Sequence, residues 1–154
     1  MNGTPTPSSP PGDRHLLALT PEECWARLEA AHVGRAVFVD ARGPVALPVN
    51  YGVFNGNIIF RTAAQSSLLA SSYAGRVGFE IDNIDEGHRV GWSVLASGHV
   101  ERADGETELR TLQSIGVEPW AEGPRNEYLR LVVSDVTGRR LALPDEGSAR
   151  PHTE

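Results

Sequence analysis

Hydrophobic residues in this chain recur mainly in short runs and at alternating positions, which is the pattern of β-strands. Asn55-Gly56 lies between two of these segments and favours a type I′ hairpin turn, because both turn positions need positive φ. Short links between successive segments predict antiparallel pairing. The expected strands span residues 36–39, 45–54, 58–62, 77–81, 90–100 and 128–136.

Three other segments carry helix signals. Thr20 is a good N-cap for a helix that starts at Pro21, and Glu23 completes a capping box, with helical apolar spacing to about Ala31. Residues 66–73 and 106–115 predict two more short helices, each ending before a glycine. Six strands with short helices predict a mainly β, α+β fold, a small closed or split β-barrel with peripheral helices. The chain has no G-x-G-x-x-G motif, which disfavours a Rossmann fold.

The two ends of the chain differ in composition from its middle. Residues 1–15 and 144–154 are polar and rich in proline, glycine and serine, so we expect a disordered tail and a flexible tail around one folded domain at 16–143. The start does not resemble a signal peptide, and no stretch approaches the roughly 20 apolar residues of a membrane span. Because Cys24 is the one cysteine, a cytoplasmic location is expected.

All 14 residues counted as Lys plus Arg are arginine. Chemistry that needs lysine, such as Schiff-base catalysis or a P-loop, is therefore excluded. The formal net charge of −6 repels polyanions, so neither nucleic acid nor an anionic membrane is an expected partner. Any phosphate group must be bound by arginine, hydroxyl groups and backbone N–H groups.

One segment combines these groups. Arg61 and Thr62 end the third expected strand, and Ser66 and Ser67 begin the next helix, so a guanidinium, hydroxyls and free N–H groups would converge on one anion. The alternative is that Ser66 caps the helix and Arg61 is a solvated strand residue. No metal site is expected, because the five histidines lack ligand spacing and the carboxylates of residues 80–86 suit a solvated strand end.

Further short motifs follow one another in order between Leu19 and Leu143. They are Val33-Gly34-Arg35, Pro48-Val49-Asn50-Tyr51, Phe60-Arg61-Thr62 with Ser66-Ser67-Leu68, Gly91-Trp92-Ser93-Val94, Pro119-Trp120-Ala121 and Val136-Thr137-Gly138-Arg139-Arg140. In order and spacing they resemble the pyridoxamine 5′-phosphate oxidase-like family of FMN-binding split barrels, and small actinobacterial members in particular. The resemblance implies a six-stranded antiparallel split β-barrel.

The resemblance also implies a flavin site. Its phosphate would be held at Arg61, Thr62, Ser66, Ser67 and Leu68, and its ring at Pro48, Val49 and Asn50, with Trp92 and Ser93 from a second subunit. It therefore implies a homodimer with ligand sites at the interface. The implied function is an FMN-dependent oxidoreductase acting with a small-molecule substrate or electron donor, and the sequence identifies no catalytic side chain.

Departures from the family pattern keep alternatives open. Many relatives have a glycine and then a basic residue, commonly lysine, where this chain has Gln65 and then Ser67, so one charge partner of the phosphate is missing. Residues 46–51 contain no basic side chain and the Arg-x-His signature is absent, so pyridoxamine phosphate is not the expected substrate. A 5-deazaflavin coenzyme or haem is an alternative ligand, and a non-catalytic carrier or sensor is the alternative function. The sequence assigns no role to Trp120.

Overall fold

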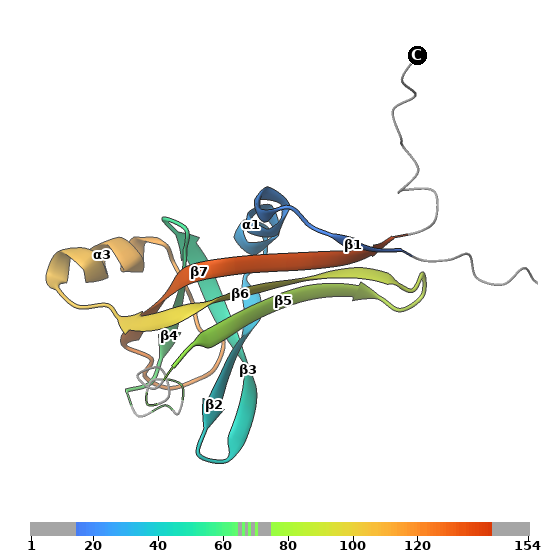
Figure 1. The fold of residues 1–154 in the computed structure, drawn as a ribbon. Helices are drawn as coiled ribbons and strands as arrows, with labels where there is room; N and C mark the ends of the chain where they lie inside the picture. The colour runs from blue at the N-terminus through green and yellow to red at the C-terminus, as the bar shows by residue number, and fades with distance from the viewer. Residues whose placement is uncertain (1–14, 65, 67, 69, 71–74, 143–154) are drawn as a thin grey trace, which may run out of the picture.

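The computed structural model describes residues 15–64, 66, 68, 70 and 75–142. Among these residues, the elements form a strongly bent antiparallel sheet with two helices, α1 and α3, on its outside (Figure 1). The elements are β1 (His15–Ala18), α1 (Pro21–Ala30), β2 (Val33–Asp40), β3 (Gly43–Phe54), β4 (Asn57–Thr62), β5 (Val77–Asp85), β6 (Val90–Arg102), α3 (Glu106–Ser114) and β7 (Glu127–Ala142).

Local sequence signals produce the expected structure at two places. At the start of α1, the Thr20 side chain accepts from the Glu23 backbone N–H at 3.2 Å, and the Glu23 carboxylate accepts from the Thr20 N–H at 2.8 Å. This is the predicted capping box. At the β3–β4 turn, Asn55 and Gly56 have φ of 49° and 69°, as a type I′ turn requires. Both predictions are confirmed.

The sheet closes into a barrel through β6 and β7. The strand order is β1-β7-β4-β3-β2-β5-β6, with an additional β6–β7 pairing, so six strands form the ring and β1 lies outside it. The expected split-barrel architecture is confirmed, but the sheet has seven strands rather than six. β1 pairs with Arg139–Ala142, on the edge of β7 that pairs with β4 at residues 127–132. β1 has four residues and no apolar alternation, so the sequence pattern does not predict it. Its pairing with β7 stabilises it as a strand.

β7 is also longer than expected, because residues 137–142 continue the strand between β6 and β1. The pairing of β6 with β7 shifts register at Ser97/Gly98. There a Cβ on Gly98 would lie 1.9 Å from the Val132 carbonyl oxygen, so only glycine allows the two backbones to approach this closely. β5 likewise continues to Asp85, four residues beyond the end of the strand expected at 77–81.

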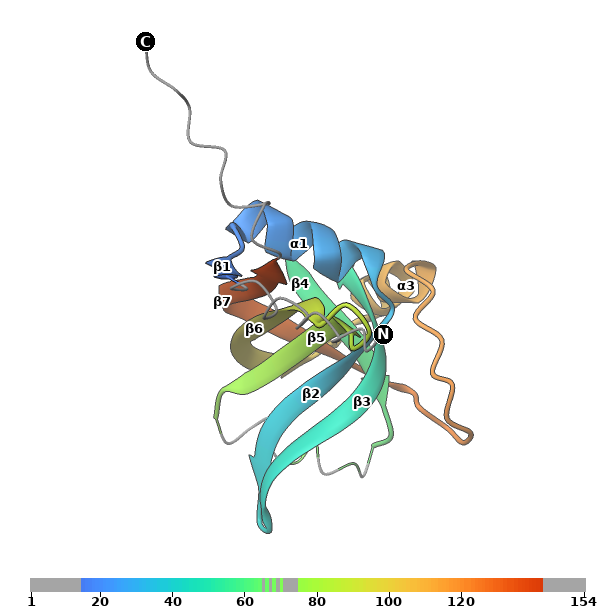
Figure 2. The ribbon, with the colours of Figure 1, turned by 90° about the vertical axis from the view of Figure 1, so that its right-hand side faces the viewer.

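Two clusters of buried side chains form the core. The larger fills the barrel and includes Tyr51, Phe60 and Phe79, and α1 covers one end of the barrel with Cys24 and Leu28 (Figure 2). The smaller lies outside the barrel, between the sheet and α3. It contains Ile59, Ala103, Leu112 and Tyr128. Successive residues of β4 therefore contribute to opposite faces, as the two-residue period of a strand requires.

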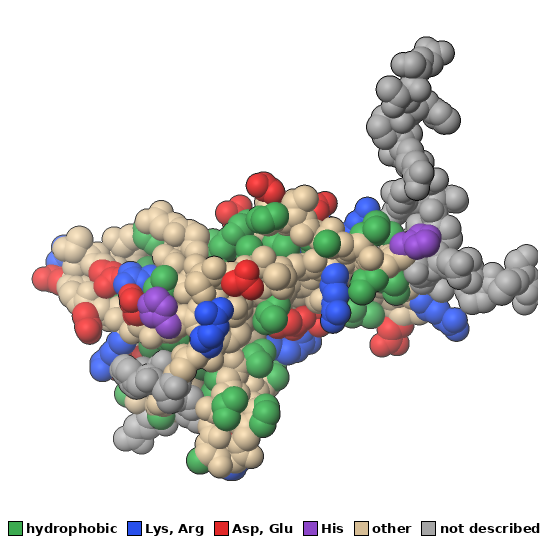
Figure 3. All heavy atoms as spheres, viewed as in Figure 1, with side chains coloured by type: hydrophobic (Ala, Val, Ile, Leu, Met, Phe, Trp, Pro, Cys, Tyr) green, Lys and Arg blue, Asp and Glu red, His purple; other side chains and the backbone are tan. Residues whose placement is uncertain are grey.

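The β2–β3 hairpin projects beyond the barrel, because β5 pairs with β2 only at Arg35–Val37 (Figure 1). Hydrophobic side chains remain on its surface (Figure 3). Val39 is 67% exposed and Leu47 is 40% exposed. Of the helix expected at 66–73, Ser66 is not helical, Leu68 and Ala70 are helical, and residues 67, 69 and 71–73, Ser67 included, lie outside the described residues. Within the described chain, neither helix has the length and hydrophobicity needed to cross a membrane.

Candidate functional site

Asn50 and Arg61 lie together on the outer face of the barrel. Tyr51 of β3 pairs with Phe60 of β4, and both side chains point into the barrel. Because side chains alternate along a strand, Asn50 before Tyr51 and Arg61 after Phe60 point outward. Both outward side chains bond the segment between α3 and β7, here called the 117–125 loop. The Asn50 Oδ1 accepts from the Trp120 N–H at 2.9 Å. Two residues predicted to bind the flavin thus fix the position of one loop.

Arg61 holds both ends of the 117–125 loop. Its Nε donates to the Arg125 carbonyl at 3.0 Å, and one Nη1–H donates to the Val117 carbonyl at 3.3 Å. The guanidinium also lies over the Tyr128 ring, 5.2 Å from the ring centroid. A guanidinium has five N–H groups, and the other three make no hydrogen bond to any residue that the structure describes. Arg61 is therefore a fixed cation that retains donors for an anion.

The hydroxyls predicted to bind the phosphate lie just after β4. Thr62 is buried, and its Oγ1 donates to the Ser66 Oγ at 2.7 Å, which holds the turn between the strand and Leu68. Leu68 is buried in the barrel core and anchors the segment there. The next two residues after Thr62, Ala63 and Ala64, line a cavity of about 420 Å³. Its other lining residues are Pro124, Asn126 and Glu127.

The residues predicted to hold the flavin ring follow β3 toward β2. Pro48 is exposed and lines a small cavity of about 130 Å³ with Arg35 and Asp82, among others. Val49 packs against the barrel core, so only its backbone faces the outer surface. Pro48 and Asn50 therefore share the outer face with Arg61, and Val49 does not.

Trp92 and Ser93 lie far along β7 from Arg61 of the same chain, although Ser93 pairs with Asp82, which lines the small cavity beside Pro48. Trp92 pairs with Arg140 of β7, whereas Arg61 pairs with Tyr128, twelve residues earlier on that strand. At about 3.3 Å per residue this separation is about 40 Å, longer than an FMN molecule. One chain therefore does not bring Trp92 and Arg61 to a single flavin.

Trp92 lies instead on the arm formed by the β5–β6 hairpin, β1 and the end of β7 (Figure 1). The guanidinium of Arg27 stacks on its ring at 5.2 Å from the centroid. Cavities of about 380 and 310 Å³ share the indole as part of their walls. The larger one is apolar, lined by Leu16, Ile84 and Leu141 among others, and Leu16 and Ile84 are each more than 60% exposed.

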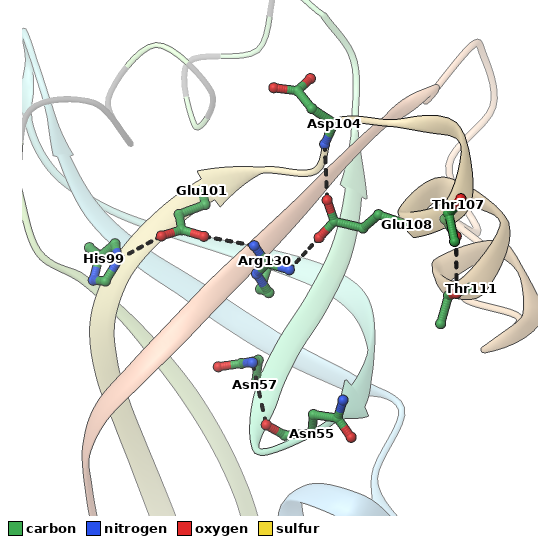
Figure 4. Close-up of polar contacts among 9 residues, drawn as sticks. All are labelled: Asn55, Asn57, His99, Glu101, Asp104, Thr107, Glu108, Thr111 and Arg130. Atoms are coloured by element: carbon green, nitrogen blue, oxygen red, sulfur yellow. Dashed lines mark hydrogen bonds and ion pairs between the residues drawn. The ribbon is translucent and has the colours of Figure 1, made fainter.

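A charge cluster fixes α3, the helix that precedes the 117–125 loop (Figure 4). Arg130 of β7 bonds Glu101 of β6 at 2.7 Å and also bonds Glu108 of α3. His99 contacts the other oxygen of Glu101 at 3.1 Å. The hydrogen bond from Arg130 lowers the pKa of Glu101, and this bond also raises the pKa of Arg130. The cluster thus connects the helix to the strands beneath it.

Three of the four carboxylates of residues 80–86 have partners within the protein. Arg35 bonds Glu80 at 2.8 Å and Asp82 at 3.0 Å, and Asp85 accepts from the backbone of His88 at 2.9 Å. In the described part of the chain, no group of three or more histidine, cysteine, aspartate or glutamate side chains is arranged to hold a metal ion.

The sequence did not identify the 117–125 loop as part of the site. Pro119-Trp120-Ala121 was a recognisable motif, but its contact with Asn50 joins residues 70 positions apart. Trp120 is 79% exposed even though its backbone is fixed. The sequence shows only that a tryptophan lies in this loop. That its exposed side chain stands on a loop bonded to Asn50 is known only from the fold.

Comparison with known proteins gives consistent matches. A family model for pyridoxamine 5′-phosphate oxidase matches residues 20–140. An uncharacterized protein of Mycobacterium tuberculosis is 30% identical over 139 residues, which cover 87% of this chain and 91% of that protein. The structure of the FAD binding protein from Mycobacterium smegmatis has a TM-score of 0.69 and 29% identity, and the match covers 82% of this chain and 100% of that one.

A second structure from Mycobacterium smegmatis, of the FAD and heme binding protein, shares the fold at a TM-score of 0.63 and 12% identity, covering 78% of this chain and 70% of that one. The architecture is thus that of split-barrel flavin-binding proteins. The family match includes β2 to β7, which carry Asn50, Arg61 and the loop that these two side chains hold. With this match and the shared fold, the chain belongs to the pyridoxamine 5′-phosphate oxidase family.

Proposed function

We propose that the protein binds FMN at the interface of a homodimer and acts as a flavin-dependent oxidoreductase. The observation that carries the proposal is the convergence of Asn50 and Arg61, two residues predicted from the sequence, on one outer face beside the Thr62–Ser66 pair. The related chain from Mycobacterium smegmatis is an FAD binding protein, which supports a flavin as the ligand.

The residues present fit a flavin. Arg61 has N–H donors that no described residue accepts from, and a cavity of about 420 Å³ lies against Ala63 and Ala64, next to the two hydroxyls. These groups would hold the phosphate. The outer face of β3 at Pro48 and Asn50 offers backbone groups and one amide to the ring. FAD contains the same ring, ribityl chain and first phosphate, so this surface suits either nucleotide.

The dimer completes the site. Trp92 and Arg61 are separated by about 40 Å along β7. Both therefore contact one flavin only if Trp92 belongs to the partner subunit. The exposed apolar residues of the arm and of the β2–β3 hairpin would be buried in such an interface. We therefore propose two sites per dimer, each built from both subunits.

In this proposal the protein binds and orients while the cofactor supplies the redox chemistry. A bound flavin exchanges hydride with its substrate or electron donor at the ring. The chain's own residues fix the phosphate, present the ring edge to β3 and exclude water with the 117–125 loop. The absence of basic side chains at residues 46–51 argues against pyridoxamine phosphate as the substrate.

The test begins with the protein purified without added cofactor. We expect a flavin absorption spectrum, FMN by mass spectrometry of the released ligand, and bleaching of the spectrum by NADH or NADPH in the absence of oxygen. Release of FAD instead of FMN would change the identity of the bound flavin but would still support the proposed flavin site. A flavin that no donor reduces would support a carrier or sensor, and a haem or deazaflavin spectrum would refute the flavin assignment.

A further inference from the structure

Trp120 has a large aromatic side chain that stands in solvent on a fixed backbone. The side chain is 79% exposed, and no described residue stacks on its ring or accepts a hydrogen bond from its indole N–H. The backbone is fixed because its N–H donates to Asn50 and because Arg61 holds both ends of the loop. The indole therefore offers an apolar face and an N–H donor to a molecule from outside the chain.

The segment that leads from α3 to Trp120 runs along the outer face of β3. A Cβ on Gly52 would lie 2.8 Å from the Ile115 Cγ2 and 3.1 Å from the Val117 Cγ2, so this close packing requires glycine. Two residues earlier on β3, Asn50 bonds the Trp120 N–H. Successive outward positions of β3 are thus covered as far as Asn50.

The outer face is open beyond Asn50. Pro48, the next outward residue of β3, is exposed, and Val33, which pairs with Asn50 from β2, is 39% exposed. This is the surface that the proposed function assigns to the flavin ring. Two residues along a strand span about 7 Å, a distance that an indole can bridge. Trp120 therefore lies at the edge of the ring surface, within reach of a molecule stacked on the flavin.

The charges at this edge are mainly negative. Glu118 and Glu122 lie on either side of Trp120 in the loop, both are exposed, and neither forms an ion pair with a described residue. Beside Pro48, the guanidinium of Arg35 is shared by two carboxylates of β5.

The nearest other cations lie on the opposite side of β3. Arg61 is on β4, and the proposed function assigns it to the flavin phosphate. Arg125 is the one cation within the loop, and its backbone is bonded to Arg61. The β2 side of Asn50, where the ring would lie, therefore keeps an excess of carboxylates, which repel an anion.

We infer that Trp120 forms one wall of the substrate site and that the substrate is a planar ring compound that is neutral or positively charged. The inference rests on the proposed function, because it concerns a molecule stacked on the proposed flavin. The indole stacks on the substrate ring and attracts a positive charge on it. The two carboxylates of the loop disfavour a negatively charged substrate.

The experiment uses three planar probes of similar size that differ in charge. They are 1-methylnicotinamide, a cation, nicotinamide, which is neutral, and nicotinate, an anion. Each is titrated into the FMN-loaded full-length protein, and binding is followed by the change in flavin absorption. We expect the cation and the neutral probe to bind more tightly than the anion. Trp120→Ala should weaken binding of the cation roughly 3- to 30-fold, the range for a cation–π contact, and leave the FMN affinity unchanged.

Matched variants separate the aromatic contribution from the charge contribution. Trp120→Phe keeps an aromatic ring and should retain most of the probe binding. Replacing both Glu118 and Glu122 by glutamine should reduce the preference for the cation over the neutral probe, as added salt should also do. Glu29→Gln removes one such charge from the exposed surface of α1 and should leave all probe affinities unchanged.

Several results would overturn the inference and leave the proposed function intact. Unchanged probe binding in Trp120→Ala would show that the indole contacts no substrate. An equal loss of FMN affinity would assign Trp120 to the flavin itself, and dissociation of the dimer would assign it to the subunit interface. A parent protein that binds no probe, or binds nicotinate most tightly, would refute the substrate class. A parent protein that binds no flavin would refute the proposed function and the inference together.

Discussion

At the scale of single residues, Tyr51 shows how one side chain joins two parts of the fold. Its ring is buried in the barrel at 4.6 Å from the Phe79 ring centroid, and its hydroxyl donates to the Leu28 carbonyl at 2.6 Å. Leu28 is in the last turn of α1, where carbonyls lack partners within the helix. Burial raises the pKa of Tyr51 far above its usual value, so the hydroxyl stays a donor.

Removing this hydroxyl leaves the Leu28 carbonyl without that partner. We expect Tyr51→Phe to lower the free energy of unfolding by about 1–3 kcal/mol, measured by urea denaturation. Tyr128→Phe is the matched control, because the Tyr128 hydroxyl is also in a buried residue but bonds no residue within the described chain. Equal effects of the two substitutions would show that the cap contributes nothing.

At the scale of elements, α3 and the 117–125 loop depend on contacts from the strands. Arg130 connects α3 to β6 through Glu108 and Glu101 (Figure 4), and Asn50 and Arg61 hold the loop that follows. The helix itself has no side-chain cap at its N-terminus. Its position is therefore set by charge pairs and by the packing of Leu112 into the smaller cluster.

The lowered pKa of Glu101 predicts a pH dependence. Because the folded-state pKa is below the ordinary value, the ionised carboxylate stabilises the fold above that ordinary value, and the contribution is lost as pH falls through the folded pKa. We expect Glu101→Gln to lower stability at pH 7 by less than about 1 kcal/mol, since the pair is partly exposed, and to match the parent protein near pH 3.

Urea denaturation at both pH values checks this expectation. His99→Asn removes the second partner of Glu101 but keeps the bond from Arg130, so it should preserve most of the pH-dependent difference. A Glu101→Gln protein that is equally destabilised at pH 7 and pH 3 would contradict an electrostatic role.

At the scale of the whole molecule, the arm and the β2–β3 hairpin extend from the barrel and expose apolar side chains. Leu16, Val39 and Ile84 are each more than 60% exposed. Large apolar side chains exposed together are typical of an interaction surface and not of a stable monomer. We expect sedimentation equilibrium to show a dimer at micromolar concentration, and a monomer at that concentration would refute the proposed shared site.

Mixing variants tests the shared site itself. Arg61→Ala and Trp92→Ala should each weaken FMN binding as pure proteins. After mixed refolding, a hybrid dimer has one site with an intact Arg61 and an intact Trp92 of the partner subunit, so FMN binding should partly recover. If Trp92 served the flavin of its own chain, mixing would restore nothing.

The sequence by itself determined most of the elements, because their signals are local. Alternating apolar residues placed six of the strands, the Thr20 capping box started α1, and Asn55-Gly56 formed the expected turn. The prediction that Arg61 and Thr62 bind a phosphate also came from order along the chain, since a strand followed by a serine-containing turn brings such groups together locally.

Tertiary structure decided what depends on distant contacts. β1 exists because the end of β7 leaves an edge free for it, and the 117–125 loop is fixed by side chains up to 70 positions away. The separation of Trp92 from Arg61 required the strand register, because spacing along a chain does not give distance across a sheet. The burial of the Arg125 Nε without a partner among the described residues is visible only after folding, because burial and hydrogen bonding are properties of the packed structure.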